Sequence, residues 1–521
     1  METVVAPCSN DIVKTSYDQS AVAVKPAFIY PSEDEREKTM AKIMAEHNVE
    51  ALPAGVSAAA YLAENSHKLA GGKALNVIDI ATLEHSFEKW RHFIPRAEPF
   101  YAMKCNPDPV IVQTLFAQGT GFDCASRREL EIALATGCPA HRIIFANPAK
   151  VPSDIEFAAE NGITKMTFDN DDELKKIATI FAKVGKCQAE PVMRIVTDDS
   201  QSKCKFSAKF GAHIEDCEHL LTIAAELGLG IIGVSFHVGS ECSSVHSYVK
   251  AIRDARHIFD IGFHTGHPMY FLDIGGGFPG HDNGVINFSV IAQAICPALE
   301  KMFPVHLNEG RLPSSITGKP IPRMQVISEP GRYFAHSTIT FGTPVIARRM
   351  NRAMPSWETE KGEEHRQPHV LYYVADGVYG VFNCIFFDHY VPLRPKIVFQ
   401  NKAKQEAHDR ALAAFEKLQA EKNKDEDSDS DDEQSKTPKE MPPGYFRVKL
   451  FGPTCDGLDT IANEIPLPLM DVDDWLIFPY LGAYSVSAAS SFNGIPRPAI
   501  RYVRTDKSGF DYKNFSSSPE N

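Results

Sequence analysis

The stretch PFYAMKCNPDPVIVQTLFAQGTGFDCASRRELEIALATGCPAHRIIFA, residues 99–146, alternates two kinds of pattern. Its short runs PFYAM, GFDCA and RIIFA are rich in aromatic and β-branched residues, which is typical of buried strands. Between them, DPVIVQTLFAQ and SRRELEIALAT carry apolar residues at helical spacing. Strands and helices in alternation predict βαβ units with parallel strands.

The same alternation continues to about residue 330. Residues 171–184 and 247–262 have helical patterns. Five further strand-like runs follow: KMTF (165–168), PVMRIV (191–196), IIGVSF (231–236), MYFLDI (269–274) and MQVIS (324–328). Eight strands in about 250 residues predict a closed (β/α)8 barrel of the TIM type over residues 75–335. An open doubly wound sheet is the alternative, because periodicity alone does not demonstrate closure.

The chain changes character after the barrel. Strand-like segments separated by turns predict a second, mainly antiparallel β-domain over residues 336–515, which an earlier N-terminal strand can join. Residues 402–444 interrupt this domain with an exposed helix over 404–422 and an acidic, low-complexity segment that is expected to be disordered. Residues 1–65 are broken by prolines and are expected to form a partly disordered arm with a short helix over 40–47.

The composition is that of a globular protein. Hydrophobic residues make up 43% and charged residues 23%, which excludes a mostly disordered, collagen-like or coiled-coil chain. Much of the net charge of −13 comes from the acidic run 425–433, and nothing indicates a nucleic-acid-binding surface. The 11 cysteines include no CxxC pair, so neither a disulfide framework nor a metal site is expected, and free thiols fit a reducing compartment. No signal-peptide core or bilayer-length apolar run is seen, so we expect a cytoplasmic protein without a membrane partner.

Polar residues and glycines follow the C-terminal ends of the predicted strands, where TIM barrels place their active sites. Each one alone has an ordinary structural explanation, such as a solvated lysine, a hydrogen-bonding histidine or a tight glycine turn. Their gathering at one rim favours a functional site. The residues concerned are Lys104, Asp123, Arg194, His237, Ser240, Gly275, Gly276, Gly277, Glu329, Gly331 and Arg332.

The rim combines a phosphate site with a lysine. The glycines after the seventh strand, together with Gly331 and Arg332 after the eighth, lie where barrels commonly bind phosphate, and glycine lets backbone N–H groups approach an anion. Lys104 can form a Schiff base with an aldehyde, so the pair predicts pyridoxal 5′-phosphate as cofactor. Glu329 can hold the proton of the ring nitrogen, and His237 can lie against the ring.

Longer motifs resemble those of the eukaryotic ornithine decarboxylases: PFYAMKCN, GTGFDCAS, SFHVGS, LDIGGGFPG, SEPGRYF, GPTCDGLD and GAYSVSAASSFNG. The resemblance runs from about residue 75 to 505, interrupted by the acidic insertion. It implies a fold of the alanine-racemase type and a head-to-tail homodimer with active sites at the interface. It also implies the conversion of ornithine to putrescine and CO₂, the first step of polyamine biosynthesis.

The resemblance implies roles for individual cofactor-binding residues. Lys104 corresponds to the Schiff-base lysine, His237 to the residue stacked on the ring, and Glu329 to the partner of the pyridine nitrogen. In this chain, Asp123, Glu129 and Arg194 correspond to family residues that lie near the cofactor. The phosphate-binding set corresponds to Ser240, Gly275, Gly276, Gly277, Gly331, Arg332 and Tyr484.

The resemblance also implies the substrate site. Asp388 and Asp456 correspond to the carboxylates that hold the distal ammonium of a diamino acid, and Cys455 to the cysteine that reprotonates the carbanion. A cationic tail needs a desolvated carboxylate, which also discriminates against uncharged side chains. Because Cys455 directly precedes Asp456, one loop would offer both the proton donor and the tail anchor.

Two residues depart from the family pattern. Glu241 stands where the family usually has the glycine after HVGS, and a carboxylate beside Ser240 should repel a phosphate unless it turns outward. Phe387 stands where a tyrosine usually precedes the Asp388 aspartate, so one hydroxyl near the substrate tail is missing.

Two alternatives follow. Within the family, lysine is the rival substrate, alone or together with ornithine, whereas diaminopimelate fits poorly beside two tail carboxylates. In another class, the chain could be a non-catalytic regulator resembling the antizyme inhibitors, which keep the fold but are expected to lose parts of the cofactor set. That set is present here: Lys104, His237, Glu329, Arg332, Tyr484 and Cys455. An antizyme-like regulatory partner is a further expectation of the resemblance.

Overall fold

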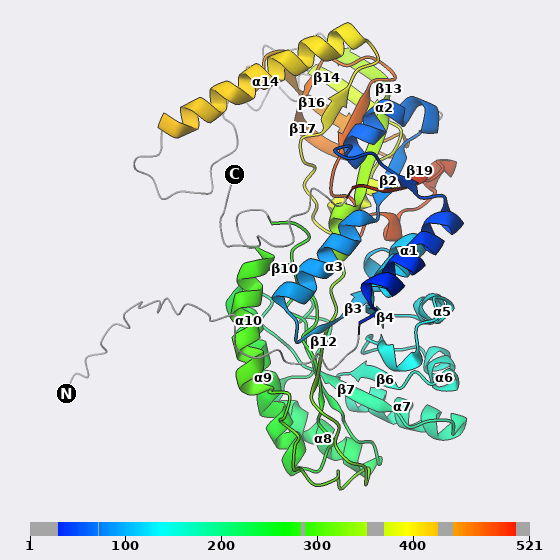
Figure 1. Cartoon of the computed structure of the whole chain (residues 1–521), viewed down its shortest axis with the longest axis vertical. Coiled ribbons are helices and arrows are strands. Elements are labelled where there is room, and N and C mark those ends of the chain that lie inside the picture. The colour runs from blue at the N-terminus through cyan, green and yellow to red at the C-terminus, as the bar shows by residue number, and fades with distance from the viewer. Residues whose placement is uncertain (1–29, 71, 283–286, 352–368, 426–440, 507–521) are drawn as a thin grey trace, which may run out of the picture.

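The computed structural model describes residues 30–506 except residues 71, 283–286, 352–368 and 426–440. A closed barrel fills the lower half of Figure 1, and a nine-stranded sheet lies above it. The barrel strands are β3 (Glu98–Ala102), β4 (Gly121–Cys124), β5 (Ile143–Phe145), β6 (Lys165–Phe168), β7 (Glu190–Arg194), β9 (Gly233–Ser235), β11 (Phe271–Asp273) and β12 (Gln325–Ser328).

The barrel is closed by parallel pairing between its first and last strands. Ile327 pairs with Glu98, and Ser328 pairs with Pro99. Every other neighbouring pair in the ring is parallel as well. The predicted TIM barrel is therefore confirmed, and the open doubly wound sheet is excluded.

Apolar side chains fill the barrel interior away from the site. A cluster of buried residues lines it: Phe100, Ile144, Ala146, Val192, Ile232, Phe271 and Ile327. The interior is thus a packed core rather than a pore, which holds the strand ends in fixed positions.

Helices surround the barrel, with α9 and α10 along one side in Figure 1 and α5, α6 and α7 along the other. Local sequence sets where they begin: the side chain of Asp108 accepts hydrogen bonds from the N–H groups of Val110 and Ile111, and Ser126 caps the following helix. The helices are α3 (Ala81–Phe93), α4 (Pro109–Gln118), α5 (Arg127–Ala135), α6 (Pro152–Glu160), α7 (Asp171–Val184), α8 (Cys217–Glu226), α9 (Val245–His264) and α10 (Phe288–Met302).

The second sheet is mainly antiparallel, as predicted, with three parallel pairs. Its strands are β1 (Glu50–Ala51), β2 (Leu75–Asp79), β13 (Ile339–Asn351), β14 (His369–Val374), β15 (Lys396–Val398), β16 (Tyr445–Phe451), β17 (Thr460–Pro468), β18 (Trp475–Phe478) and β19 (Ala499–Arg504). The pairs β1–β19, β19–β2 and β14–β16 are parallel. The earlier strand expected to join this sheet is β2, so residues 75–79 belong to the sheet rather than to the start of the barrel.

The described part of the N-terminal region, from residue 30, is mostly helical. The helix α1 (Glu33–His47) begins earlier than the predicted residue 40, because Ser32 and Glu35 form a capping box. Met40 and Ile43 of α1 are buried, and α2 (Ala58–Ala70) packs against the sheet. Residues 1–29 lie outside the described residues.

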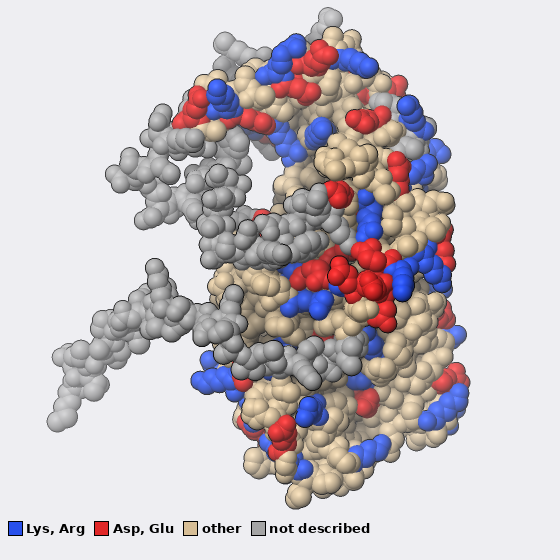
Figure 2. Space-filling view, in the orientation of Figure 1, with Lys and Arg blue, Asp and Glu red and all other residues tan. Residues whose placement is uncertain are grey.

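The insertion begins with α14 (Lys402–Asp425), which extends from the sheet at the top of Figure 1. The exposed helix predicted over 404–422 is present, and the acidic segment 426–440 lies outside the described residues. Figure 2 shows acidic and basic side chains interspersed, with the densest acidic group at mid-height. Within the described residues, no helix is long and apolar enough to cross a membrane.

Candidate active site at the barrel mouth

Lys104 lies just after β3, in a short 3-10 helix (Met103–Cys105), and its ammonium Nζ is 2.5 Å from Oδ2 of Asp123. The Asp123 side chain is fully buried, whereas 38% of the Lys104 side chain is accessible. Burial opposes the charge, but the carboxylates of Asp123 and Glu329 outweigh it and raise the pKa of Lys104.

Glu329 directly follows β12 and lies within electrostatic reach of this pair. Its Oε1 is buried and has no hydrogen-bond partner within the described part of the chain. Burial raises the pKa of Glu329 well above its usual value, and the nearby charges of Asp123 and Asp273 raise it further. An unpartnered buried carboxyl oxygen calls for a donor, and the protonated ring nitrogen of pyridoxal 5′-phosphate is such a donor.

Asp273, which sequence reasoning missed, lies close enough to Glu329 for its charge to raise the pKa of that carboxyl. It is fully buried and accepts hydrogen bonds from Ser235 Oγ (2.8 Å) and from the N–H of Gly275 (2.9 Å). Burial raises its pKa to about 6. An acid inside the apolar run MYFLDI was the signal that could have found it, because buried carboxylates usually have a specific partner.

His237 follows β9 with its ring in a defined tautomer. The N–H of Gly239 donates to Nδ1 at 3.0 Å, so the proton of the neutral ring lies on Nε2. Burial lowers the pKa of His237 well below its usual value, and the charges of Arg194 and Lys104 lower it further. Arg194, at the end of β7, therefore lies within electrostatic reach of the ring, as predicted. Its guanidinium also faces the Phe210 ring, with 5.4 Å between Cζ and the centroid.

The three glycines after β11 leave room for backbone only. An added Cβ would lie 2.1 Å from Phe236 O at Gly275, 2.9 Å from His237 Nε2 at Gly276, and 2.6 Å from Gly239 O at Gly277. Gly275 and Gly277 also have positive φ, of 64° and 102°. Only glycine fits this turn, and its bare backbone suits close approach of a phosphate.

Arg332 completes the anion-binding side of the rim. It is 5% exposed, and its Nε and Nη2 both lie 3.2 Å from Ser240 Oγ. Its Cζ is 5.3 Å from the Tyr484 ring centroid. Gly331 precedes it where a Cβ would lie 3.0 Å from that of Cys105. A buried cation beside a glycine cradle and a hydroxyl is a suitable phosphate site, so these residues fit the predicted cofactor.

The predicted tail carboxylates do not meet within one chain. Asp388 is 4% exposed and forms an ion pair with Arg332, the residue that also contacts Ser240. Asp456 instead accepts a hydrogen bond from Tyr379 Oη. No hydrogen bond or ion pair among the described residues joins Asp456 or Cys455 to Lys104. Glu129 lies within electrostatic reach of Lys104, but its carboxylate accepts a hydrogen bond from the Ala125 N–H at 2.6 Å.

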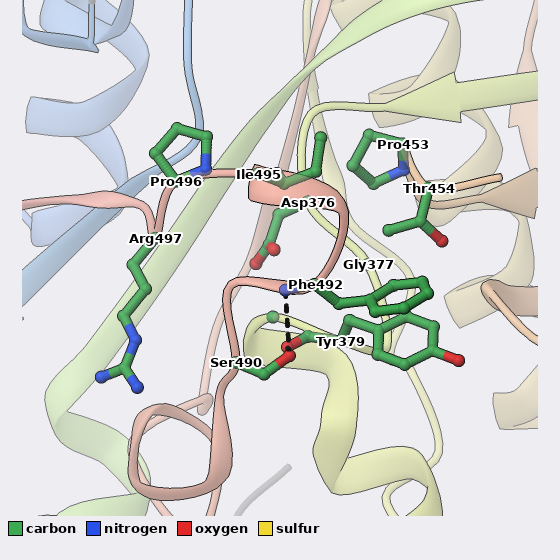
Figure 3. A pocket seen from close by; sticks show the side chains of 11 residues that line it. Asp376, Gly377, Tyr379, Pro453, Thr454, Ser490, Phe492, Ile495, Pro496 and Arg497 are labelled. Carbon is green, nitrogen blue, oxygen red and sulfur yellow. Dashed lines mark hydrogen bonds between the residues drawn. The ribbon is translucent and has the colours of Figure 1, made fainter. Parts of the chain in front are cut away.

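Cys455 and Phe387 are exposed side chains, the latter by 71%. Beside Cys455 is the pocket of Figure 3, whose lining includes Thr454, Asp376 and Ser490. The rings of Tyr379 and Phe492 stack there with centroids 4.3 Å apart. Sequence reasoning missed Tyr379, and no local pattern marks its bond to Asp456, which is 77 residues away in sequence.

Comparisons with known proteins agree with this geometry. Residues 80–336 match the family model described as pyridoxal-dependent decarboxylase, pyridoxal binding domain. The chain is 41% identical to the ornithine decarboxylase of Rattus norvegicus, over 82% of this chain and 80% of the rat protein. It is 38% identical to antizyme inhibitor 2 of Xenopus laevis, over 82% and 81% of the two chains.

Among solved structures, a lysine/ornithine decarboxylase from Vibrio vulnificus complexed with putrescine matches with a TM-score of 0.62 and 27% identity, covering 85% of this chain and 97% of that one. The closed barrel, the lysine at its mouth and the matches over more than 80% of the chain all point to one family. The chain therefore belongs to the family of pyridoxal-dependent decarboxylases that includes the eukaryotic ornithine decarboxylases.

Proposed function

We propose that this protein decarboxylates L-ornithine to putrescine and CO₂, with pyridoxal 5′-phosphate as its cofactor, in the first step of polyamine biosynthesis. The observation that carries the proposal is the contact between Lys104 and Asp123 beside the unpartnered oxygen of Glu329, in a chain 41% identical to a rat ornithine decarboxylase.

Each cofactor-binding residue then has a distinct task. When bound, the cofactor supplies an electron sink for the electron pair left on Cα as CO₂ departs. Lys104 would provide the amine for its aldehyde, and Asp123 orients that amine. Glu329 would hold the ring-nitrogen proton, and His237 would face the ring. Burial, together with the charge of Arg194, keeps the imidazole of His237 neutral. The phosphate is held by Ser240, Gly275, Gly276, Gly277, Gly331, Arg332 and Tyr484.

The substrate site requires a second copy of the chain. Asp388 belongs to the barrel mouth, whereas Asp456 and the exposed Cys455 lie on the loop that follows β16. We infer a homodimer in which Asp388 of one protomer and Asp456 of its partner bind the distal ammonium. The thiol of Cys455 then protonates Cα after CO₂ leaves, and the exposed Phe387 borders the tail site.

The test is a product assay with ornithine, lysine and arginine in parallel. We expect putrescine from ornithine, and no turnover by Lys104→Ala. Cadaverine as the main product would favour lysine as substrate, the alternative that the missing hydroxyl at Phe387 leaves open. Agmatine as the main product would contradict both.

A second candidate is a non-catalytic regulator like the antizyme inhibitor that matches this chain. The observation that favours it is Glu241, an acid within 3.5 Å of Arg332. The visible spectrum of the purified protein separates the two functions, because bound pyridoxal 5′-phosphate absorbs visible light and a protein without it does not.

An antizyme-like partner and a cytoplasmic location are further proposals. The location is supported by the free thiols of the described cysteines.

A further inference from the structure

Glu241 lies on a small two-stranded ribbon at the barrel mouth. Its strands β8 (Ser202–Cys204) and β10 (Ser240–Cys242) are antiparallel, with Ser240 opposite Cys204 and Cys242 opposite Ser202. Lys203 is therefore directly opposite Glu241, and Nζ of Lys203 is 3.0 Å from Oε2 of Glu241. The backbone of Glu241 has a φ of 50°, a left-handed conformation that favours glycine.

The other oxygen of Glu241 faces Arg332. Oε1 is 3.5 Å from Arg332 Nε, and the same guanidinium also pairs with Asp388. Two carboxylates thus share one buried cation. Burial opposes ionisation of Glu241, but Arg332 and Lys203 outweigh it and lower the pKa of its carboxyl, so Glu241 is an anion at neutral pH.

We propose that Glu241 is a positioning residue that lowers the affinity of this chain for its cofactor by acting on the groups that bind the phosphate. Lys203 reduces this loss of affinity. The inference rests on the proposed function, in which Arg332 and Ser240 hold that phosphate. A carboxylate beside Arg332 competes for its donors and repels a second anion. Lys203 neutralises part of that charge and draws Glu241 toward the ribbon.

The effect is selective for the phosphate group. Pyridoxal lacks the phosphate, yet its aldehyde can attach to Lys104 in the same way. Glu241 should therefore change the affinity for pyridoxal phosphate and leave the affinity for pyridoxal unchanged. A residue that only stabilised the barrel mouth would change both affinities alike.

The experiment is a titration of the full-length protein, freed of cofactor, with pyridoxal phosphate and with pyridoxal, followed by absorbance. We expect Glu241→Gln, which keeps the side-chain size, to bind pyridoxal phosphate about tenfold more tightly, because the change removes the charge that repels the phosphate. Lys203→Ala should weaken binding roughly threefold, and this loss should vanish in the Glu241→Gln background.

A matched control is Glu464→Gln, because Glu464 forms an ion pair of 2.7 Å with Arg447 on exposed positions of the β-domain. This change alters the net charge equally and should leave both affinities unchanged. If the parent binds pyridoxal phosphate through Lys104 and Glu241→Gln binds it equally or more weakly, the role of Glu241 is overturned while the proposed function stands. Equal tightening toward pyridoxal also overturns it. If neither the parent nor Glu241→Gln binds pyridoxal phosphate, both proposals fail.

Discussion

Lys104 has the two properties that a cofactor-binding lysine needs, since its ammonium is held by Asp123 and its side chain remains 38% accessible. We expect Lys104→Ala to lose the visible absorption of bound cofactor, because Lys104 is the amine that lies beside Asp123 and within electrostatic reach of Glu329. Turnover should fall roughly a thousandfold or more. Lys175→Ala, which removes an exposed lysine paired with Asp171 on α7, is the control. An unchanged spectrum in Lys104→Ala would assign the attachment to another residue.

At the same scale, His267 links stability to pH. It is 1% exposed, its Nδ1 accepts the Ile231 N–H at 3.1 Å, and its Nε2 faces Leu221 O at 3.0 Å, so the ring is neutral. Burial lowers its pKa from 6.5 to about 4. The unfolded chain therefore takes up the proton first as pH falls, and the stability due to neutral His267 is present above pH 6.5 and lost between pH 6.5 and 4.

For this histidine, the lost free energy of unfolding at pH 4 is about 3 kcal/mol. We expect His267→Gln to be less stable than the parent at pH 7.5 but to lose less stability on acidification. Urea unfolding at several pH values measures the two slopes. His257→Gln, at an exposed position of α9, is the control. Equal slopes in parent and His267→Gln would mean that folding does not change the pKa of His267.

At the scale of elements, the first turns of α14 attach it to the sheet. Gln405 accepts the Phe399 N–H at 2.7 Å, His408 contacts Tyr445 Oη at 2.8 Å, and Lys404 pairs with Asp471 at 2.9 Å. Farther along the helix Leu418 is 56% exposed. The attachment and the projecting part can therefore be separated by mutation.

Replacing residues 412–440 of this insertion with a Gly-Ser linker should leave both turnover and the melting temperature near those of the parent. Replacing 404–440 removes the attached turns as well and should lower the melting temperature by a few degrees, at about 2–4 °C per kcal/mol, with turnover still within a few-fold. Thermal unfolding and the product assay check both variants. A collapse of activity in the shorter replacement would show that the insertion shapes the site.

At the scale of the whole molecule, the two halves of the proposed site lie on different domains. Lys104 belongs to the barrel, and Cys455 belongs to a loop of the sheet. In the proposed dimer, Lys104→Ala and Cys455→Ala are each nearly inactive, but a mixed dimer collects both defects in one site and neither in the other. With random reassortment about half the dimers are mixed, so roughly a quarter of the parental activity should return on mixing.

That mixing experiment needs proof of subunit exchange, which a tagged copy of one variant supplies by co-purification of the other. Because both changes only shorten side chains, neither should prevent dimer formation. Activity that stays at the level of the single variants, despite confirmed exchange, would contradict sites shared between chains.

Much of the fold and the site could be predicted from local sequence. Apolar runs located all eight barrel strands, because a strand buried on both faces must be apolar whatever its neighbours are. The glycines after β11 could be recognised because the turn excludes any side chain. Cap residues set the starts of α4 and α5. The start of α1 was predicted too late, at residue 40, although the capping box of Ser32 and Glu35 is a local pattern that could have located it.

The sequence by itself therefore determined the order and kind of the elements. It also identified the candidate lysine and the glycine and arginine motifs, since these depend on periodicity and short-range geometry. Only the tertiary structure decided that β12 pairs with β3, that β2 joins the distant sheet, and that Asp388 and Glu241 both contact Arg332. Such contacts join residues far apart in the chain. Their formation depends on how all the elements pack together, and no local stretch of sequence carries that information.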